Sequence, residues 1–350
     1  MRILAVTQPN SGVGYHRMML PLRHLPGVSV LFTDFINDEV LERGFDIVTF
    51  NRFIPGVELS DLIAFRKKYG FKMVLDLDDY WILDSWHILA QNFPSQVIVD
   101  HIRAADLVTV THDRLLKEVR PLNSCWETLA NALPFDEGQF HAGRVDVDAM
   151  NDSMEQPVAD GAVRFLYAGG ITHRKDIELM AHPMRALADD DKYRERIHLI
   201  MAGYDDSNPQ TIPTWNGMVR DYTAAHRMNF HLRAPLPPDA YMAFYAEADV
   251  AFAPLVESKF NTMKSNIKAL EAGCKYIPLI ASDVHPYQPI PPVLKVEARR
   301  DWGKFIRRMV DSKWQREDAG KALGEYVRRE YHLTNWNKKR KQLYEWIITK

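Results

Sequence analysis

Cysteine is scarce in this 350-residue chain, which contains only Cys125 and Cys274. Two cysteines exclude a disulfide framework and a four-cysteine zinc site, and they are typical of a reducing cytoplasm. Long apolar runs are missing as well, since no stretch reaches the ~18 apolar residues of a membrane-spanning helix. The apolar run at the N-terminus, RILAV, is too short for the core of a secretion signal. We therefore predict a cytoplasmic protein without an integral membrane segment.

Net charge is also nearly absent, because 44 basic and 46 acidic residues leave a balance of -2. The molecule as a whole therefore does not attract nucleic acid or an anionic membrane, and any anion site must be local. A hydrophobic content of 46% over 350 residues is enough for two separate cores. The composition thus indicates a globular protein of two domains.

Short β-branched runs alternate with helical patterns in both halves of the chain. In the first half, strands are expected at 2–7, 28–33, 46–50, 72–77 and 107–111, and helices near 14–24, 58–69 and 95–104. In the second half, strands are expected at 163–170, 197–203, 228–232, 249–255 and 276–282, and helices from Lys175, at 238–247 and near 264–273. Such alternation is typical of a parallel sheet covered by helices.

A polar, acidic stretch without hydrophobic periodicity separates the two halves, from about residue 141 to 162. The predicted fold is α/β, with two Rossmann-like domains facing a central cleft. We expect an N-terminal domain at 1–150, a C-terminal domain at 162–332 and a final helix at 333–350 that crosses back to the first domain. The carboxyl ends of the strands would line the cleft, which is the expected site.

The segment SGVGYHR, residues 11–17, follows the first strand and opens a helix. Gly12 and Gly14 would let an anion approach the backbone closely, and the start of a helix attracts negative charge. The third glycine of a dinucleotide motif is missing, so a plain tight turn is the alternative.

Basic residues occupy a strand-to-helix turn in the second half, within YAGGITHRKD at 167–176. Arg174 and Lys175 can neutralise a diphosphate there. Two cations at a helix start oppose the helix dipole, which a purely structural role does not explain. The alternative is a solvated basic turn.

The stretch ESKFNTMKSNIKALEAG, from residue 257, places Asn261, Lys264 and Ser265 at an expected helix start. Lys264, Lys268 and Glu271 recur at three- and four-residue steps, so they would share one helix face. Lysine and free backbone amides would bind an anion, and Glu271 would bind ribose hydroxyls. The alternative is a solvated face with Lys–Glu pairs.

These motifs of the second half resemble the donor half of GT4-like, retaining glycosyltransferases of the GT-B fold. The resemblance runs from FLYAGG through HRKD and IMAG to FNTMKSNIKALEAG, and it reaches the first half loosely through SGVGYHR and LPFDEGQF. Of the two glutamates in the family's helix motif, Glu271 matches the second, and Met263 stands at the first. Lys175 matches the family's lysine, whereas Gly170 replaces its arginine and leaves Arg174 as a substitute.

The resemblance implies an enzyme that transfers a hexose or pentose from a nucleotide diphosphate sugar, its co-substrate, to a hydroxyl acceptor on a glycan or small molecule, without a cofactor. It implies donor-binding roles for Gly14, Gly170, Arg174, Lys175, Asn261, Lys264, Ser265, Glu271 and Arg233, the last in the loop that seats the base. Lys264 and Arg174 would also be catalytic, because they stabilise the charge of the leaving diphosphate. Acceptor-binding roles fall to Tyr15, His16, Arg17, Asp78, Asp79, Trp81 and His87.

Three carboxylates lie in VLDLDDYW, residues 74–81. Asp-x-Asp after a strand is the metal site of one-domain sugar transferases of the GT-A kind. This chain predicts two Rossmann-like domains and supplies cations from its own side chains, so we expect no metal. Asp78 and Asp79 are predicted to be catalytic residues on the acceptor side, next to Trp81. The alternative is that Asp79 caps a helix and Trp81 lies in a core.

The acceptor and the type of reaction each stay open to a second interpretation. Basic groups late in the chain, among them Lys338 to Lys341, can follow a phosphate backbone while a base is swung out of the duplex. VLDLDDYW also resembles virus-encoded glycosyltransferases, some of which modify hydroxymethylated bases in DNA. A hydroxymethylcytosine-type base in DNA is therefore the second candidate acceptor. A sugar-nucleotide epimerase and a non-catalytic sugar-nucleotide sensor share the predicted architecture, and both remain candidate functions.

Overall fold

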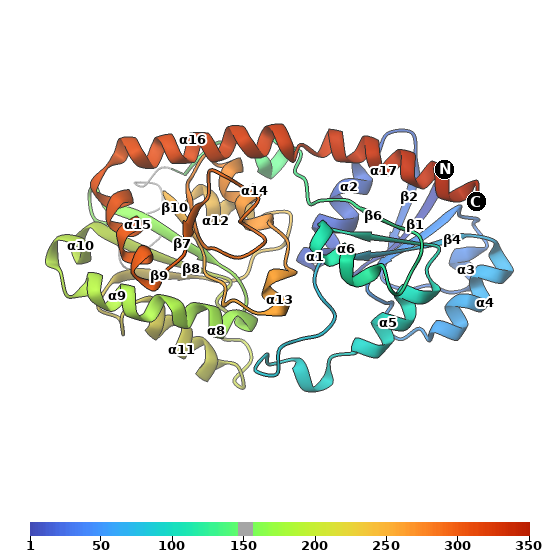
Figure 1. Cartoon of the computed structure of the whole chain (residues 1–350), viewed down its shortest axis with the longest axis horizontal. Coiled ribbons are helices and arrows are strands. Elements are labelled where there is room, and N and C mark those ends of the chain that lie inside the picture. The colour runs from blue at the N-terminus through green and yellow to red at the C-terminus, as the bar shows by residue number, and fades with distance from the viewer. Residues whose placement is uncertain (146–156) are drawn as a thin grey trace. The chain divides into compact units, whose positions relative to one another are not determined.

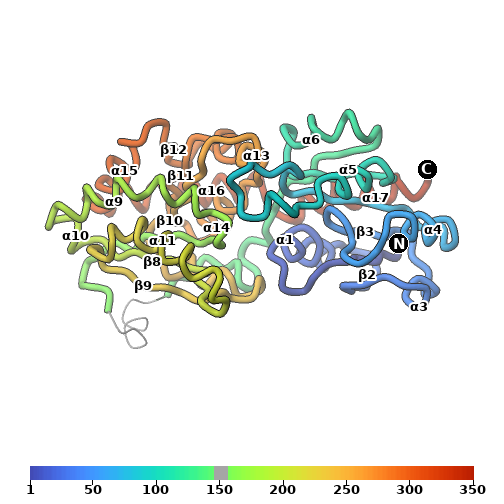
Figure 2. The backbone as a smooth tube through the Cα atoms, turned by 90° about the horizontal axis from the view of Figure 1, so that it is seen from below, coloured from blue at the N-terminus to red at the C-terminus, as the bar shows by residue number. Residues whose placement is uncertain are grey.

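The computed structural model describes residues 1–145 and 157–350. Residues 146–156, which fall within the linker predicted for 141–162, lie outside the described residues. Internal contacts divide the chain into two units. The first unit comprises Met1–Pro134, Met263–Ser265 and Tyr331–Lys350, and the second comprises Phe135–Thr262 and Asn266–Glu330. Figure 2 traces the backbone through both units.

In the described part of the chain, the first unit is built on a parallel six-stranded sheet in the order β2-β1-β3-β4-β5-β6. Its strands are β1 (Arg2–Val6), β2 (Ser29–Thr33), β3 (Ile47–Asn51), β4 (Lys72–Leu77), β5 (Leu107–Val110) and β6 (Trp126–Thr128). The strand order reverses at β1, because β2 lies on one side of β1 and β3 on the other. The carboxyl ends of β1 and β3 therefore form the topological switch point, where ligands bind in open α/β sheets.

Helices cover both faces of this sheet (Figure 1). The described helical segments of this unit are α1 (Gly12–Gly14), the π-helical turn η1 (Tyr15–Met19), α2 (Leu20–Arg23), α3 (Asp38–Leu41), α4 (Leu59–Tyr69), η2 (Ala90–Asn92), α5 (Ser95–Ala104), α6 (Asp113–Val119) and α17 (Leu333–Ile348). On one face, Leu22 of α2 and both Tyr344 and Ile347 of α17 pack into a core with Ile3 and Ile47 of the strands. The last helix of the chain is thus part of the first unit's core.

The second unit contains, among its described residues, a parallel six-stranded sheet in the order β12-β11-β10-β7-β8-β9. Its strands are β7 (Val163–Ala168), β8 (Ile197–Ala202), β9 (Asn229–Arg233), β10 (Val250–Ala253), β11 (Leu279–Ser282) and β12 (Leu294–Val296). The order reverses at β7, which lies between β8 and β10. The switch point of this unit is therefore at the carboxyl ends of β7 and β10.

Helices also cover both faces of the second sheet. The described helical segments of this unit are η3 (Gly138–Phe140), η4 (Ile171–His173), α8 (Arg174–Ile177), η5 (Glu178–Met180), α9 (Ala181–Ala188), α10 (Asp191–Arg196), α11 (Ile212–Tyr222), α12 (Met242–Ala246), α13 (Lys259–Thr262), α14 (Ile267–Cys274), α15 (Arg299–Asp311) and α16 (Lys313–Glu330). Figure 1 shows α8, α9 and α11 on one side of the sheet and α12, α14 and α16 on the other. The core on the first of these sides joins Phe165 and Leu199 of the strands to Met184, Met218 and Ile306 of the helices.

Helix boundaries differ from the sequence prediction in two places that matter for function. The helix predicted near 264–273 begins only at Ile267, so Lys264 and Ser265 lie in the segment between α13 and α14. Ser265 and Asn266 favour helix ends over helix interiors, which explains the late start. The helix predicted near 14–24 begins with α1 and then widens into the π-helical turn η1.

Candidate functional site

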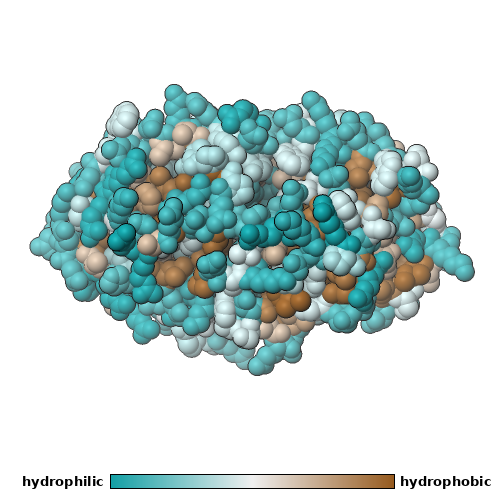
Figure 3. Space-filling view, viewed as in Figure 1, coloured by the Kyte–Doolittle hydropathy of each residue, from teal (hydrophilic) through white to brown (hydrophobic). Residues whose placement is uncertain are grey.

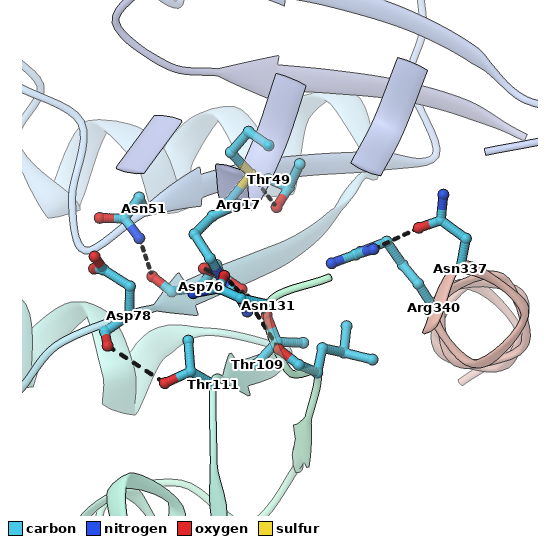
Figure 4. Close-up of polar contacts among 12 residues, drawn as sticks. Arg17, Thr49, Asn51, Asp76, Asp78, Thr109, Thr111, Asn131, Asn337 and Arg340 are labelled. Atoms are coloured by element: carbon cyan, nitrogen blue, oxygen red, sulfur yellow. Dashed lines mark hydrogen bonds and ion pairs between the residues drawn. The ribbon is translucent and has the colours of Figure 1, made fainter. Parts of the chain in front are cut away.

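A buried ion pair lies near the carboxyl end of β4 in the first unit, next to β5 (Figure 4). Arg17 donates from Nε to Oδ1 of Asp76 at 2.8 Å and from Nη2 to Oδ2 at 2.7 Å, and it also donates to the Leu129 carbonyl and to Asn131. Thr109 donates to Oδ2 of Asp76 at 2.6 Å. Because both oxygens of Asp76 and four donors of Arg17 are engaged within the protein, this pair braces the sheet. The sequence analysis assigned no functional role to Asp76 and predicted that Arg17 binds the acceptor.

Arg52 connects the two other carboxylates of VLDLDDYW. Its Nη2 lies 3.1 Å from Oδ1 of Asp78 and 3.4 Å from Oδ2 of Asp79. Arg52 has a φ of 60°, a left-handed conformation that is uncommon for a residue other than glycine and is often found at functional sites. Burial raises the pKa of Asp79, Lys264 opposes this rise, and neighbouring Asp78 adds to it. A carboxyl group of this kind is suited to accepting a proton.

A pocket of about 150 Å³ lies at the switch point of the first unit. Gln8 after β1, Arg52 after β3, and Ser11 and Gly14 of the SGVGYHR segment contribute to its lining. A Cβ at Gly14 would lie 2.2 Å from Oγ1 of Thr7, so a larger residue there would force the Thr7 side chain to move. The structure thus brings Gly14 and Arg52 together at one small pocket.

The remaining acceptor candidates of the first unit occupy different surroundings. Tyr15 is buried and lies edge-to-face with His16, and burial together with Arg17 lowers the pKa of His16 to about 4. Trp81 is buried against Tyr80, with 5.0 Å between the ring centroids. This agrees with the alternative that Trp81 lies in a core. His87 is half-buried, and its Nδ1 accepts the backbone N–H of Leu89.

At the switch point of the second unit, Gly170 is exposed and an added Cβ would meet open space. The basic pair that follows is engaged locally. Arg174 lies 2.8 Å from Asp221 of α11 and 3.4 Å from Glu178. Lys175 is exposed and lies 3.2 Å from the same Glu178.

Asp176 is the centre of a buried hydrogen-bond network that the sequence pattern did not reveal. Its Oδ1 accepts the Val256 backbone N–H at 2.7 Å and Nδ2 of Asn261 at 2.9 Å, and its Oδ2 lies 2.6 Å from Nδ1 of His173. Asn261 also donates to the Val256 carbonyl. Asn261 therefore holds Asp176 and the loop after β10 in place. In the HRKD segment, the sequence analysis considered Arg174 and Lys175. The residues of this segment that belong to the network are His173 and Asp176.

Lys268 and Glu271 lie together on α14, as their spacing predicts. The Lys268 ammonium donates to the Ala168 carbonyl at the end of β7 and lies 5.6 Å from the Tyr167 ring centroid. Burial raises the pKa of Glu271 to about 7, opposed by Lys268 and by a hydrogen bond with Tyr245. Elsewhere at this edge of the sheet, Arg233 ends β9 and pairs with Glu247 at 2.9 Å.

Several of the late basic residues have acidic partners close by. Ion pairs join Lys339 to Glu127, Arg328 to Asp136 and Arg329 to Glu330. Arg340 is buried and donates to Asn337 at 2.6 Å. These contacts give the residues structural roles, and DNA as a partner stays a prediction.

Two further features are absent from residues 1–145 and 157–350. These residues contain no group of three or more His, Cys, Asp or Glu side chains arranged to hold a metal ion. None of their helices has both the length and the apolar character needed to cross a bilayer.

Figure 3 shows mainly hydrophilic residues on the visible face, with small apolar groups between them.

Comparison with known proteins finds similarity in structure. Neither a family model nor a curated protein matches the sequence. A glycosyltransferase from Rickettsia africae superimposes with a TM-score of 0.67 at 12% identity, covering 99% of this chain and 98% of the other. HepE from Anabaena in complex with UDP-glucose gives a TM-score of 0.66 at 10% identity over 100% of both chains. An α,α-trehalose 6-phosphate synthase from Burkholderia multivorans gives 0.59 at 13% identity, covering 87% of this chain and 70% of the other.

The TM-scores of these superpositions show a shared fold, and the identities of 10–13% limit the conclusion to the fold. Two six-stranded parallel sheets, each covered by helices, form two Rossmann-like units of the GT-B type. The fold class predicted from the sequence is therefore confirmed.

Proposed function

We propose that this protein is a glycosyltransferase that moves a sugar from a nucleotide diphosphate sugar to a hydroxyl acceptor. The observation that supports the proposal best is the likeness to HepE, whose structure is a complex with UDP-glucose and which aligns over 100% of both chains. Rossmann-like units bind nucleotides at their switch points. In the second unit the β7/β10 switch point combines an open glycine, Gly170, with a hydrogen-bonded polar network.

The proposed chemistry is the breaking of the bond between the anomeric carbon and the diphosphate. Positive charge grows on the sugar and negative charge on the leaving diphosphate, so fixed cations lower the barrier. We assign Lys264 to the diphosphate, Ser265 to a phosphate oxygen and Glu271 to the ribose. Arg233, at the end of β9, is assigned to the region of the base. Each of these assignments is part of the proposal.

Asp79 is assigned to the acceptor hydroxyl. Its burial raises its pKa, which makes it a better proton acceptor than an exposed aspartate. Arg52 lies 3.4 Å from its Oδ2 and holds the carboxylate in place. Asp78 pairs with the same Arg52, whose Nη2 lies 3.1 Å from its Oδ1.

The test is a screen of nucleotide sugars that measures release of nucleoside diphosphate, with and without sugar, small-molecule and hydroxymethylcytosine DNA acceptors. Diphosphate release with a gain of one sugar mass on an acceptor is the expected result. An isomerised nucleotide sugar without diphosphate release would identify an epimerase instead. Binding of nucleotide sugars with no turnover under any condition would identify a sensor.

Lys264→Ala should then reduce transfer by roughly a hundredfold, because one transition-state charge contact contributes about 3 kcal/mol. Lys259→Ala is the matched control, since Lys259 is an exposed lysine on the neighbouring helix α13. Transfer by Lys264→Ala at the rate of the control would refute the donor-site assignment.

A further inference from the structure

A histidine and an aspartate form a hydrogen-bonded pair at the β7/β10 switch point. His173 ends the short turn η4 that follows β7, and its Nδ1 lies 2.6 Å from Oδ2 of Asp176. Asp176 is 1% exposed, whereas the side chain of His173 is 15% exposed. The buried carboxylate thus supports a histidine that is partly accessible at the edge of the sheet where ligands bind.

Asp176 is fixed from its other side by elements that follow β10. Its Oδ1 accepts hydrogen bonds from the Val256 backbone and from the side chain of Asn261 on α13. A carboxylate held in this way keeps the orientation of the imidazole to which it is bonded. It also favours a proton on Nδ1. Nε2, the ring nitrogen that does not face Asp176, gains a second N–H when the negative charge of a bound ligand lies beside it.

The other two basic residues of the same turn, Arg174 and Lys175, form ion pairs with acidic side chains. Arg174 packs over Gly217 of α11, where an added Cβ would lie 3.1 Å from its Nε, and its guanidinium pairs with Asp221. Lys175 pairs with Glu178 at the surface. Of the three basic residues in HRKD, His173 is the one that a buried carboxylate orients at the switch point.

We propose that His173 donates a hydrogen bond from Nε2 to the diphosphate of the nucleotide sugar, and that Asp176 is the residue that positions it. The inference rests on the proposed function and assigns to His173 the role that the sequence pattern gave to Arg174. The bond strengthens as negative charge grows on the departing diphosphate. No proton needs to leave the histidine for this effect.

The first experiment measures equilibrium binding of UDP, GDP, ADP and CDP by calorimetry, which does not require turnover. The test variant is His173→Asn, because the asparagine amide can take the place of Nδ1 and keep the bond to Asp176 while Nε2 is lost. The matched control is His182→Asn, an identical change at an exposed histidine on α9. We expect His173→Asn to weaken binding of the preferred diphosphate about tenfold or more and the control to bind normally.

Unfolding midpoints of both variants are measured alongside, and we expect them to stay near that of the unchanged protein. Arg174→Gln is the third variant, and it should weaken diphosphate binding less than His173→Asn does. Normal binding by His173→Asn, a larger loss in Arg174→Gln, or no binding of any diphosphate by the unchanged protein would each overturn the inference.

Turnover separates this inference from the proposed function. If the protein transfers sugar but His173→Asn keeps both its kcat and its diphosphate affinity, only the inference fails. If diphosphate binding depends on His173 but no donor is turned over, the inference holds and the proposed transferase fails. In an active enzyme, we expect His173→Asn to lower kcat more than it raises KM, because the contact is strongest in the transition state.

Discussion

Glu271 is a buried carboxyl group whose folded pKa of about 7 lies above its ordinary value of 4.5. Between these two pH values the folded protein binds a proton that the unfolded chain has released. The stabilisation linked to this proton is therefore complete below pH 4.5 and is lost as the pH rises through 7. The loss amounts to roughly 3 kcal/mol at most, given 1.36 kcal/mol for each unit of pKa difference.

Urea unfolding at pH 5 and pH 8 checks this prediction when the protein is compared with Glu271→Gln, which stays neutral at both values. The stability of the unchanged protein relative to this variant should fall between pH 5 and pH 8. Glu325→Gln, at an exposed position on α16, is the matched control and should show a constant difference. A constant difference for Glu271→Gln as well would contradict the raised pKa.

Single residues were harder to assign from the sequence than the elements that hold them. VLDLDDYW displays three aspartates, but the chain around them does not reveal that Asp76 binds Arg17, which is 59 positions away. Likewise, the pairing of Asp176 with Val256 and Asn261 depends on β7 and β10 being neighbours in the sheet. Residue roles of this kind follow from tertiary contacts, which periodicity does not encode.

At the scale of elements, α17 shows how a helix late in the sequence stabilises the first unit. Ile347 is 3% exposed and belongs to the core that contains Ile3 and Ile47 of the sheet. Ile347→Ala removes buried methyl groups and leaves a cavity, so it should lower the free energy of unfolding of this unit by about 3 kcal/mol.

Denaturant unfolding, followed by a probe in the first unit, measures this loss. Gln342→Ala is the control on the same helix, where the side chain is exposed and the change should stay within about 0.5 kcal/mol. Equal stability of the two variants would show that α17 does not contribute to the core in solution.

Most strands were predicted because buried parallel strands appear as short β-branched runs, whereas the three-residue strands β6 and β12 were missed. KMVLDL, for example, matches β4 without an error at either end. The helix near 264–273 was placed too early, because the Lys and Glu spacing continues through Ser265 and Asn266, where the backbone is not yet helical. The spacing of side chains along the sequence does not reveal that the helical backbone is interrupted between α13 and α14.

At the scale of the whole molecule, the repeated strand–helix alternation was sufficient to predict two Rossmann-like units. The GT-B likeness over complete chains confirms that prediction. The linker between the halves and the nature of the acceptor have no comparable pattern. The same alternation serves many reactions, so the substrate depends on a few side chains at the strand ends.

The aspartates of VLDLDDYW already have partners within the protein. A divalent metal prefers several carboxylate or carbonyl oxygens as ligands. Here Asp76 is engaged by Arg17 and Thr109, while Asp78 and Asp79 both face Arg52. A metal ion at this strand end would have to displace the Arg52 guanidinium, which already supplies positive charge. We therefore expect sugar transfer to continue at an unchanged rate in excess EDTA, measured as nucleoside diphosphate release.

Loss of activity in EDTA that manganese restores would instead show that these aspartates bind a metal. Arg52→Ala provides the matching variant, since removal of its charge should reduce transfer in EDTA-treated enzyme without creating a need for added manganese.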